Sequence, residues 1–376
     1  MAEMGGRLAD CGLAGRKMRQ GQQCRLAGDV MFYEIAEKAL ALEAKGKKIV
    51  RLNVGDTSLP TPECALEAAA REMKRGKSGY GSSAGMPALR EAIARREGCG
   101  VENVVVGPGS KHLLFGLLMI LCKKGGSVAM QSPHYPAYAL ACRQLGLKIK
   151  LAETSLEGRW QLGKVPSADA LVVCNPLNPT STICEKSAVD RAIAKAKESK
   201  AAVIVDEAYR GIAFKDIPAP DAIRVRSFSK EFNMENWRLG YAVAPKEVAG
   251  KLVEFLQATS TCVAPFVQAA GVACLENEDE ILEINREIWK MRMAAASKAM
   301  RAAGFEFAEP QAGMYIFATH GGIADAEKYA MKLLERGVAV APGSAFGNFR
   351  SFVRICANQP EDVLEDAIAK MGEAAK

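Results

Sequence analysis

The sequence contains no apolar run long enough to cross a membrane. Its longest strongly apolar stretch, from Leu113 to Cys122, has about half the length that a membrane-spanning helix needs, and Gly116 interrupts it. The chain also lacks a block of basic residues, because its 50 lysines and arginines are interspersed with 43 acidic residues and give a net charge of +7. A nucleic-acid-binding protein concentrates its basic residues on one face. We therefore expect neither a membrane nor a nucleic acid as partner, and the mild positive charge favours small anionic ligands.

Close pairs of metal-ligating residues are missing as well. The eleven cysteines include no CxxC pair, and the three histidines have no spacing typical of metal ligands. We expect no metal site, and we expect reduced thiols in a cytoplasmic protein. Nucleotide-binding motifs are incomplete: Gly107-Pro108-Gly109 is followed by His112, where a dinucleotide-binding motif has its third glycine, and there is no P-loop.

Length and patterning divide the chain into three parts. At roughly 100–200 residues per domain, 376 residues allow two domains. Residues 1–28 are rich in glycine, arginine and glutamine without sustained periodicity. This segment predicts a disordered tail, with a targeting peptide or a true start at Met31 as alternatives. We predict a large domain over residues 49–275 and a small domain that joins residues 29–48 to residues 276–376.

Short apolar runs in the middle of the chain predict strands that are buried on both faces, because they lack the alternation of a half-exposed strand. Helical segments such as Ser110–Leu121 and Lys186–Lys197 lie between many of them. This pattern predicts an α/β fold whose large domain has a mostly parallel central sheet flanked by helices. The predicted strands are Asn103–Val106, Ser127–Gln131, Lys148–Ala152, Ala170–Cys174, Ala201–Val205, Ile223–Ser227 and Leu239–Ala244.

Both ends of the chain follow a different pattern. A helix over Phe32–Lys45 precedes a strand-like Ile49–Val54 near the N-terminus. After residue 275, a long helix over Asp279–Ala303 begins a smaller α+β unit. The other elements predicted for that unit are strands at Phe305–Phe307, Met314–Ala318, Val338–Val340 and Phe352–Cys356, a helix over Ala324–Arg336, and a last helix from Pro360.

A lysine and an aspartate stand just after two of the central strands. Ser227-Phe228-Ser229-Lys230 follows a buried strand, where loss of hydration favours the neutral amine that a Schiff-base lysine needs. Asp206 ends an apolar strand and begins the segment Asp206-Glu207-Ala208-Tyr209. Ligands of open α/β sheets bind at this edge. A partly buried carboxylate there needs a cationic partner, and a protonated pyridine would serve.

Other segments could bind anions or present fixed polar groups. Gly107-Pro108-Gly109-Ser110-Lys111 lies between a strand and a helix, where free N–H groups suit one phosphate. Arg238, in Trp237-Arg238-Leu239-Gly240-Tyr241, could pair with the same phosphate. Arg354 lies inside an apolar strand, where its planar fork suits a carboxylate, with an internal salt bridge as the alternative. The segment Asn175-Pro176-Leu177-Asn178-Pro179-Thr180 holds two amide side chains on extended backbone.

In this order the motifs resemble those of the class I/II aminotransferases, which belong to the fold-type I pyridoxal-phosphate family. The resemblance covers the chain from about residue 31 to the C-terminus. It implies the fold of that family, pyridoxal 5'-phosphate as cofactor and transamination between an amino acid and a 2-oxo acid. It also implies a homodimer with shared active sites.

The resemblance further implies roles for individual residues. Lys230 would form the Schiff base with the cofactor and move the proton at the substrate Cα. Asp206 would keep the pyridine nitrogen protonated, and Tyr209 and Asn178 would hydrogen-bond the ring hydroxyl. The remaining cofactor contacts would be Gly109, Ser110, Lys111 (through its backbone), Ser229 and Arg238 at the phosphate, Tyr135 stacked on the ring, and Tyr80 reaching the phosphate of the neighbouring subunit. Arg354 would bind the substrate α-carboxylate, with help from Asn178 and the backbone near Gly55.

Some positions depart from the family pattern. Ser181 and Asn236 stand where glycine is usual, and Gly55-Asp56-Thr57-Ser58-Leu59 replaces the usual GDPDF segment. These changes concern loops and the substrate pocket rather than catalytic groups.

Lys111 is the residue that best indicates which amino acid is the amino donor. In one subgroup of aspartate aminotransferases, a lysine at the equivalent place in GGKQALF recognises the distal carboxylate. Here the run is Gly109-Ser110-Lys111-His112-Leu113-Leu114-Phe115. The resemblance therefore favours aspartate as donor and 2-oxoglutarate as acceptor. Alanine, aromatic and histidinol-phosphate aminotransferases stay open, as do a C–S lyase or decarboxylase of the same fold and a PLP-binding regulator.

Overall fold

The computed structural model describes residues 27–76 and 79–376 of the chain. The predicted N-terminal tail therefore lies outside the described residues, apart from its last two positions. Ala27 and Gly28 belong to helix α1 (Ala27–Glu43), which thus begins inside the segment predicted as tail. No helix within the described ranges combines the length and the apolar character that a membrane span requires.

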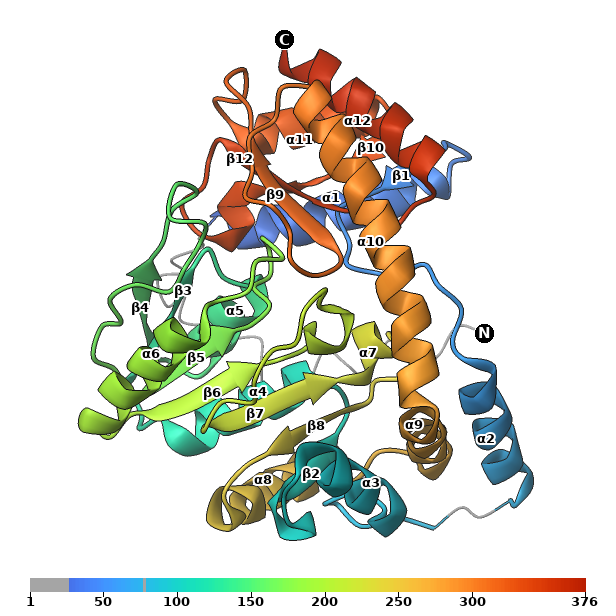
Figure 1. The fold of residues 1–376 in the computed structure, drawn as a ribbon, viewed down its shortest axis with the longest axis vertical. Helices are drawn as coiled ribbons and strands as arrows, with labels where there is room; N and C mark the ends of the chain where they lie inside the picture. Colours follow the sequence, from blue (N-terminus) through green and yellow to red (C-terminus); the bar gives the residue numbers. More distant parts are fainter. Residues whose placement is uncertain (1–26, 77–78) are drawn as a thin grey trace, which may run out of the picture.

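A seven-stranded sheet forms the lower part of the molecule in Figure 1. Strand β8 runs antiparallel to both of its neighbours, and the other pairings are parallel. All seven predicted strands are present, with bounds that differ by at most one residue, so the α/β fold with a mostly parallel sheet is confirmed. In order across the sheet, the strands are β2 (Val104–Gly107), β8 (Gly240–Val243), β7 (Ile223–Ser227), β6 (Ala202–Asp206), β5 (Ala170–Cys174), β3 (Ser127–Ser132) and β4 (Lys148–Glu153).

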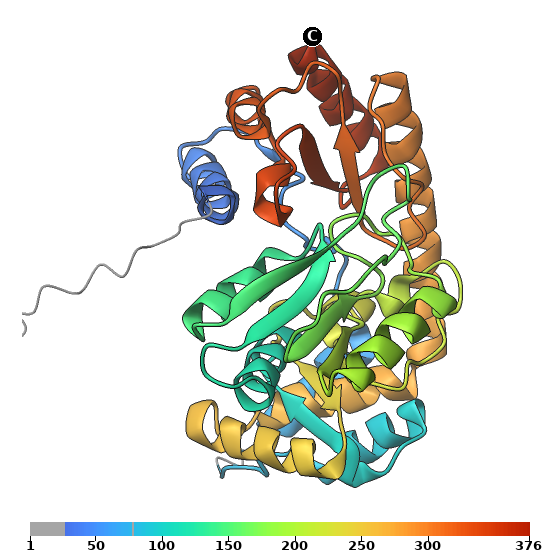
Figure 2. The same ribbon diagram turned by 90° about the vertical axis from the view of Figure 1, so that its left-hand side faces the viewer.

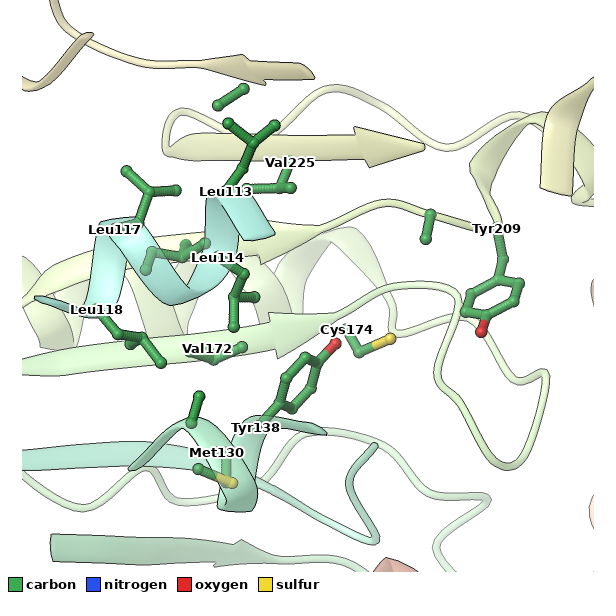
Figure 3. Packing of buried hydrophobic residues seen from close by; sticks show 14 of the residues in the cluster. Leu113, Leu114, Leu117, Leu118, Met130, Tyr138, Val172, Cys174, Tyr209 and Val225 are labelled. Atoms are coloured by element: carbon green, nitrogen blue, oxygen red, sulfur yellow. The ribbon is translucent and has the colours of Figure 1, made fainter. Parts of the chain in front are cut away.

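Helices cover both faces of this sheet, and successive residues of one strand point to opposite cores. On one face Val172 of β5 packs in a cluster with Leu113 and Leu117 (Figure 3). On the other face Val173 packs in a cluster with Ile193. The first face is covered by α4 (Ser110–Leu121), α5 (Pro136–Gln144) and α8 (Lys246–Thr259), and the second by α6 (Lys186–Glu198), α2 (Glu63–Lys74), α3 (Pro87–Glu97) and α9 (Pro265–Glu276).

A second hydrophobic core is built from both ends of the chain, and it occupies the upper part of Figures 1 and 2. Ile35 and Leu52 from the N-terminal segment pack in one cluster with Leu333 and Ile355. Strand β1 pairs with β10 rather than with the large sheet, so Leu52 lies in this core. The elements are α1, β1 (Val50–Arg51), α10 (Glu278–Ala302), β9 (Tyr315–Thr319), α11 (Ala326–Glu335), β10 (Val338–Ala339), β11 (Ala341–Pro342), β12 (Phe352–Cys356) and α12 (Glu361–Ala375).

Two predicted strands of this second unit are much shorter than expected, and β10 ends one residue before the predicted Val340. The run Ile49–Val54 forms a strand only at Val50–Arg51. Beyond it, Leu52 still bonds the backbone of Ala339 and Cys356, and the Asn53 oxygen accepts from the Arg354 side chain. Farther along, Gly55 and Thr57 bond side chains of the large-sheet unit, those of Lys230 and Glu235. The run Phe305–Phe307 contributes a single bridge, between Glu306 and Thr319.

Candidate active site

A cavity of about 470 Å³ opens between the seven-stranded sheet and the second core. Residues at the carboxyl ends of β5, β6 and β7 line one side of it, where ligands of open α/β sheets bind. Eleven of the thirteen residues predicted for the site line this cavity: Gly55, Ser110, Lys111, Tyr135, Asn178, Asp206, Tyr209, Ser229, Lys230, Arg238 and Arg354.

The two other predicted residues lie elsewhere. Gly109 directly precedes α4, and a Cβ there would lie 2.6 Å from Arg238 Nη2, so it adjoins the cavity. Tyr80 is not among the lining residues, and its side chain is 89% exposed. The structure thus brings twelve of the predicted residues together and leaves Tyr80 on the surface of its own chain.

Asp206 ends β6 with its carboxylate buried, at 7% exposure. Its Oδ2 accepts a hydrogen bond from the hydroxyl of Tyr138 at 2.6 Å, and its Oδ1 accepts one from the N–H of Ala208 at 3.0 Å. Burial raises the pKa of the Asp206 carboxyl, whereas these two donors lower it. No lysine, arginine or histidine of the described residues forms an ion pair with it. A cationic group bound in the cavity would offset the cost of its desolvation.

Tyr138 is a site residue that sequence reasoning missed. Its hydroxyl lies beside Cys174, at the carboxyl end of β5 (Figure 3). It stands on α5, three residues after the predicted Tyr135, and both residues line the cavity. Tyr135 immediately precedes this helix, and a residue about one turn farther along lies on the same side. That spacing is the signal that could have found it.

Asn178 links Tyr209 to Arg354. Its Nδ2 donates to the Tyr209 hydroxyl at 2.9 Å, and its Oδ1 accepts from Arg354 Nη1 at 3.1 Å. The amide is therefore held in one orientation by a partner on each side. Tyr315 was not predicted, but its hydroxyl lies 3.2 Å from that of Tyr209, and a Cβ on Gly55 would collide with it.

Arg354 lies in the middle of β12, and only 1% of this charged residue is exposed. Its Nη2 donates to the backbone oxygen of Asn53 at 2.6 Å. The centre of its guanidinium lies 4.2 Å from the ring centroid of Tyr315 and 4.8 Å from that of Phe346. These contacts fix a planar cation at the wall of the cavity, where it can bind a carboxylate.

The N-terminus of α4 and the Arg238 guanidinium form the basic end of the cavity. Gly109 has a φ of 86°, which favours glycine, and the closeness of Arg238 leaves no room for a side chain there. Ser229 lines the same cavity, and its N–H donates to Ser227 Oγ at 3.2 Å. Free N–H groups at a helix N-terminus, a hydroxyl and a guanidinium together suit a phosphate group.

Lys230 stands on the short helix α7 (Phe228–Glu231) and is partly buried. Its Nζ donates to the backbone oxygen of Gly55 at 2.5 Å and lies 3.4 Å from Glu235 Oε1. Glu235 Oε1 also accepts from the N–H of Thr57 at 2.7 Å. Sequence reasoning missed Glu235, which stands between the lysine motif and the Trp237–Tyr241 motif without belonging to either.

Lys111 follows the first residue of α4, and its Nζ lies 5.7 Å from the ring centroid of Tyr135. Its pKa is raised, chiefly by the phenol of Tyr135, so the side chain is a cation at neutral pH. Tyr33 of α1 also lines the cavity and contributes to this increase. The exposed ammonium of Lys111 is therefore a cationic group that faces the cavity in addition to Arg238, Lys230 and Arg354.

Comparison with known proteins identifies the family. The family described as Aminotransferase class I and II matches residues 47–371. The chain belongs to this family. Among curated relatives, the aspartate aminotransferase of Thermococcus kodakarensis is 36% identical over 312 residues, which is 81% of this chain and 83% of the relative. The aspartate/prephenate aminotransferase of Thermus thermophilus is 30% identical, and the alignment covers 89% of this chain and 92% of the relative.

Solved structures agree with this membership. The aspartate aminotransferase of Thermus thermophilus with maleate superposes with a TM-score of 0.86 at 29% identity, over 92% of this chain and 96% of that one. The enzyme of Thermotoga maritima gives a TM-score of 0.84 at 26% identity, over 93% and 98% of the two chains. The protein is therefore a pyridoxal-phosphate-dependent aminotransferase, as the motifs predicted.

The cavity suits pyridoxal 5'-phosphate on three independent grounds. The start of α4, Ser229 and Arg238 offer donors to the phosphate. The buried carboxylate of Asp206 lacks a cationic partner among the described residues, and a protonated pyridine nitrogen supplies one. Lys230 presents an amine to the same space.

Proposed function

We propose that this aminotransferase takes L-aspartate as its preferred amino donor and 2-oxoglutarate as its acceptor. The observation that carries the proposal is the presence of two cationic side chains, Arg354 and Lys111, on the cavity wall besides the phosphate-binding Arg238 and the cofactor-binding Lys230. Two cations match the two carboxylates of a dicarboxylic substrate. The names of the relatives and the dicarboxylate maleate in the Thermus thermophilus structure support the same choice.

Within this function, each group at the cofactor has a specific task. When bound, pyridoxal 5'-phosphate supplies an electron sink for the bonds at the substrate Cα. Lys230 would hold the cofactor through its amine and would carry the proton at the substrate Cα. Asp206 would keep the pyridine nitrogen protonated, and Tyr138 holds the carboxylate of Asp206 in place. Tyr209, oriented by Asn178, would offer its hydroxyl to the ring oxygen.

The other assigned residues bind and orient. Gly109, Ser110, the backbone of Lys111, Ser229 and Arg238 would hold the phosphate. Tyr135 would contact the cofactor ring. Arg354 clamps the substrate α-carboxylate together with Asn178 and the backbone near Gly55, because its guanidinium already stands fixed at the wall.

The donor preference can be tested with a half-reaction panel. Purified enzyme is mixed with each amino acid in turn, and conversion of the cofactor to its amino form is followed by absorbance. We expect aspartate to react fastest. Lys111→Ala should lower kcat/KM for aspartate by about 10- to 100-fold, because one charge-assisted contact is lost, while alanine and tyrosine stay within about twofold.

A matched control removes a lysine that has no part in the cavity. Lys123→Ala serves this purpose, because its side chain is 81% exposed and pairs only loosely with Asp169, at 3.7 Å. It should leave the whole panel unchanged. Equal losses for every donor in Lys111→Ala, or a wild-type preference for alanine or tyrosine, would contradict the acidic-substrate proposal. Prephenate belongs among the acceptors tested, because one relative is named an aspartate/prephenate aminotransferase.

We further propose a homodimer with shared sites. Tyr80 supports this proposal, because a large aromatic side chain with 89% exposure is typical of a surface that another chain covers. In such a dimer Tyr80 reaches the phosphate of the neighbouring subunit. Light scattering on the purified protein should give twice the chain mass of 40.3 kDa. A mass of one chain at micromolar concentration would contradict the dimer.

We also propose that the two hydrophobic cores correspond to two domains and that the enzyme works in the cytoplasm. The pairing of β1 with β10 and the packing of Leu52 in the second core support a small domain that includes residues up to Leu52, with a large domain that continues to about residue 275. The nine described cysteines are all free thiols, which suits a reducing compartment.

A further inference from the structure

A closed ring of contacts joins the amine of Lys230 to the loop after β1. The Nζ atom donates to the backbone oxygen of Gly55 at 2.5 Å and lies 3.4 Å from Glu235 Oε1. The same Oε1 accepts from the N–H of Thr57 at 2.7 Å. Glu235 thus bonds the lysine and the loop with a single oxygen. Its backbone oxygen also accepts from Arg238 Nη1 at 2.6 Å, which ties it to the phosphate end of the cavity.

Glu235 is the carboxylate that meets this ammonium. Among the described residues, no other acidic side chain lies within ion-pair distance of Lys230. Asp56 lines the same cavity, but its carboxylate pairs with Arg51 at 3.4 Å. Cys356 also lies near the lysine, but burial raises the pKa of its thiol to about 12, so it stays neutral.

The contact with Thr57 does not itself require a charge. A backbone N–H needs only an acceptor, and a neutral amide or hydroxyl oxygen would serve. Of the two contacts that Glu235 Oε1 makes, only the one with the Lys230 ammonium therefore uses the negative charge of the carboxylate. This charge matters because another carboxylate, that of Asp206, lines the same cavity and would attract an unpaired ammonium.

We propose that Glu235 is a positioning residue for Lys230: its carboxylate holds the ammonium beside Gly55 whenever the lysine is not bonded to the cofactor. The inference rests on the proposed role of Lys230. A lysine that holds the cofactor must leave it during each half-reaction and return afterwards. Glu235 gives the released side chain one fixed place, and it keeps the ammonium away from Asp206 and from the carboxylates of the substrate.

The test measures the reactivity of the Lys230 amine rather than turnover. The full-length protein, with pyridoxamine 5'-phosphate bound and without cofactor, is treated at one pH with a limiting amount of acetic anhydride. Labelling of Lys230 is read by peptide mass spectrometry, with exposed Lys123 as the internal reference. Glu235→Gln removes the charge and keeps an acceptor for Thr57. Glu247→Gln is the matched control, because that side chain is 81% exposed on α8.

Labelling of Lys230 in Glu235→Gln should be about tenfold faster than in wild type, because the amine loses the charge-assisted contact that holds it beside Gly55. Hydrogen exchange at the Thr57 amide should stay at the wild-type rate in this variant. In Glu235→Ala, both labelling and exchange should be faster. Glu247→Gln should match wild type in both measurements.

Labelling of Lys230 at the wild-type rate in a folded Glu235→Gln protein would overturn the proposal. Should that protein fail to fold, Glu235→Ser removes the same charge, and the same two outcomes apply. A wrong assignment of Lys230 is recognisable separately, because borohydride would then attach the cofactor to a different lysine, whatever the labelling rates.

Discussion

Replacing Lys230 with alanine should lower the rate of the aspartate half-reaction by roughly a thousandfold or more, because both a nucleophile and a proton carrier are lost. The same change should abolish covalent attachment of the cofactor. Wild-type protein treated with borohydride should carry the cofactor on the peptide that contains Lys230, and the variant should carry none. Rapid-mixing absorbance measures the rate, and peptide mass spectrometry measures the attachment.

Two other lysine variants serve as controls for this experiment. Lys111→Ala should keep the covalent attachment, because that side chain faces the substrate part of the cavity in our proposal. Lys123→Ala should keep both attachment and rate, because its side chain is 81% exposed. Attachment to any lysine other than Lys230, or a variant that retains more than a tenth of the wild-type rate, would refute the assignment.

Replacing Arg226 with methionine should destabilise the fold by about 3–5 kcal/mol, the usual cost of removing one partner from a buried ion pair. Arg226 of β7 donates to Glu97 at 2.8 Å and to Glu231 at 2.5 Å, and all three side chains are at most 6% exposed. Arg224 and Arg96 also pair with these carboxylates, so the loss should fall near the lower end of the range. Thermal unfolding followed by circular dichroism measures the effect.

A surface pair provides the comparison. Arg301 and Glu309 lie 2.6 Å apart but are both more than half exposed, so Arg301→Met should cost less than about 1 kcal/mol. If the two variants lower the melting temperature equally, the buried network does not stabilise the fold. Because Glu231 directly follows Lys230, Arg226→Met should also weaken cofactor binding.

The same network predicts an acid limit to stability. Burial opposes ionisation of Glu97, but Arg226 and Arg224 outweigh it and lower the pKa of that carboxyl to about 2. A folded-state pKa below the unfolded value of 4.5 stabilises the fold above about pH 4.5. This contribution is lost as the pH falls from about 4.5 toward 2. In Arg226→Met that part of the pH dependence should shrink.

The large sheet and most of the site could be predicted because local patterns specify them. Runs such as Ala170–Cys174 are buried on both faces, and the edge where parallel strands end locates Asp206 and Lys230 without any structure. Tyr138 could have been found from its spacing to Tyr135, but Tyr315 and Glu235 could not. They come from a strand and a turn outside the motifs, and only the folded chain brings their polar atoms to the cavity.

The short strand near residue 50 was hard to predict for a related reason. Strand β1 has two residues, and its partner β10 lies at Val338–Ala339, near the other end of the chain. Pairing over such a distance leaves no periodicity in the local sequence. The prediction for Ile49–Val54 therefore gave the right kind of element but too great a length.

The second core also determines when each part of the protein can fold during its synthesis. Ile35 and Leu52 leave the ribosome early, but Leu333, which shares their core, follows roughly 280 residues later. At about 5–20 residues per second, this is a delay of about 15–60 s. The seven-stranded sheet, which ends with β8 at Val243, can assemble in that time. Until the last third of the chain is synthesised, the apolar face of α1 remains exposed. A chain that ended before this part would leave the face uncovered, and the exposed face would favour aggregation.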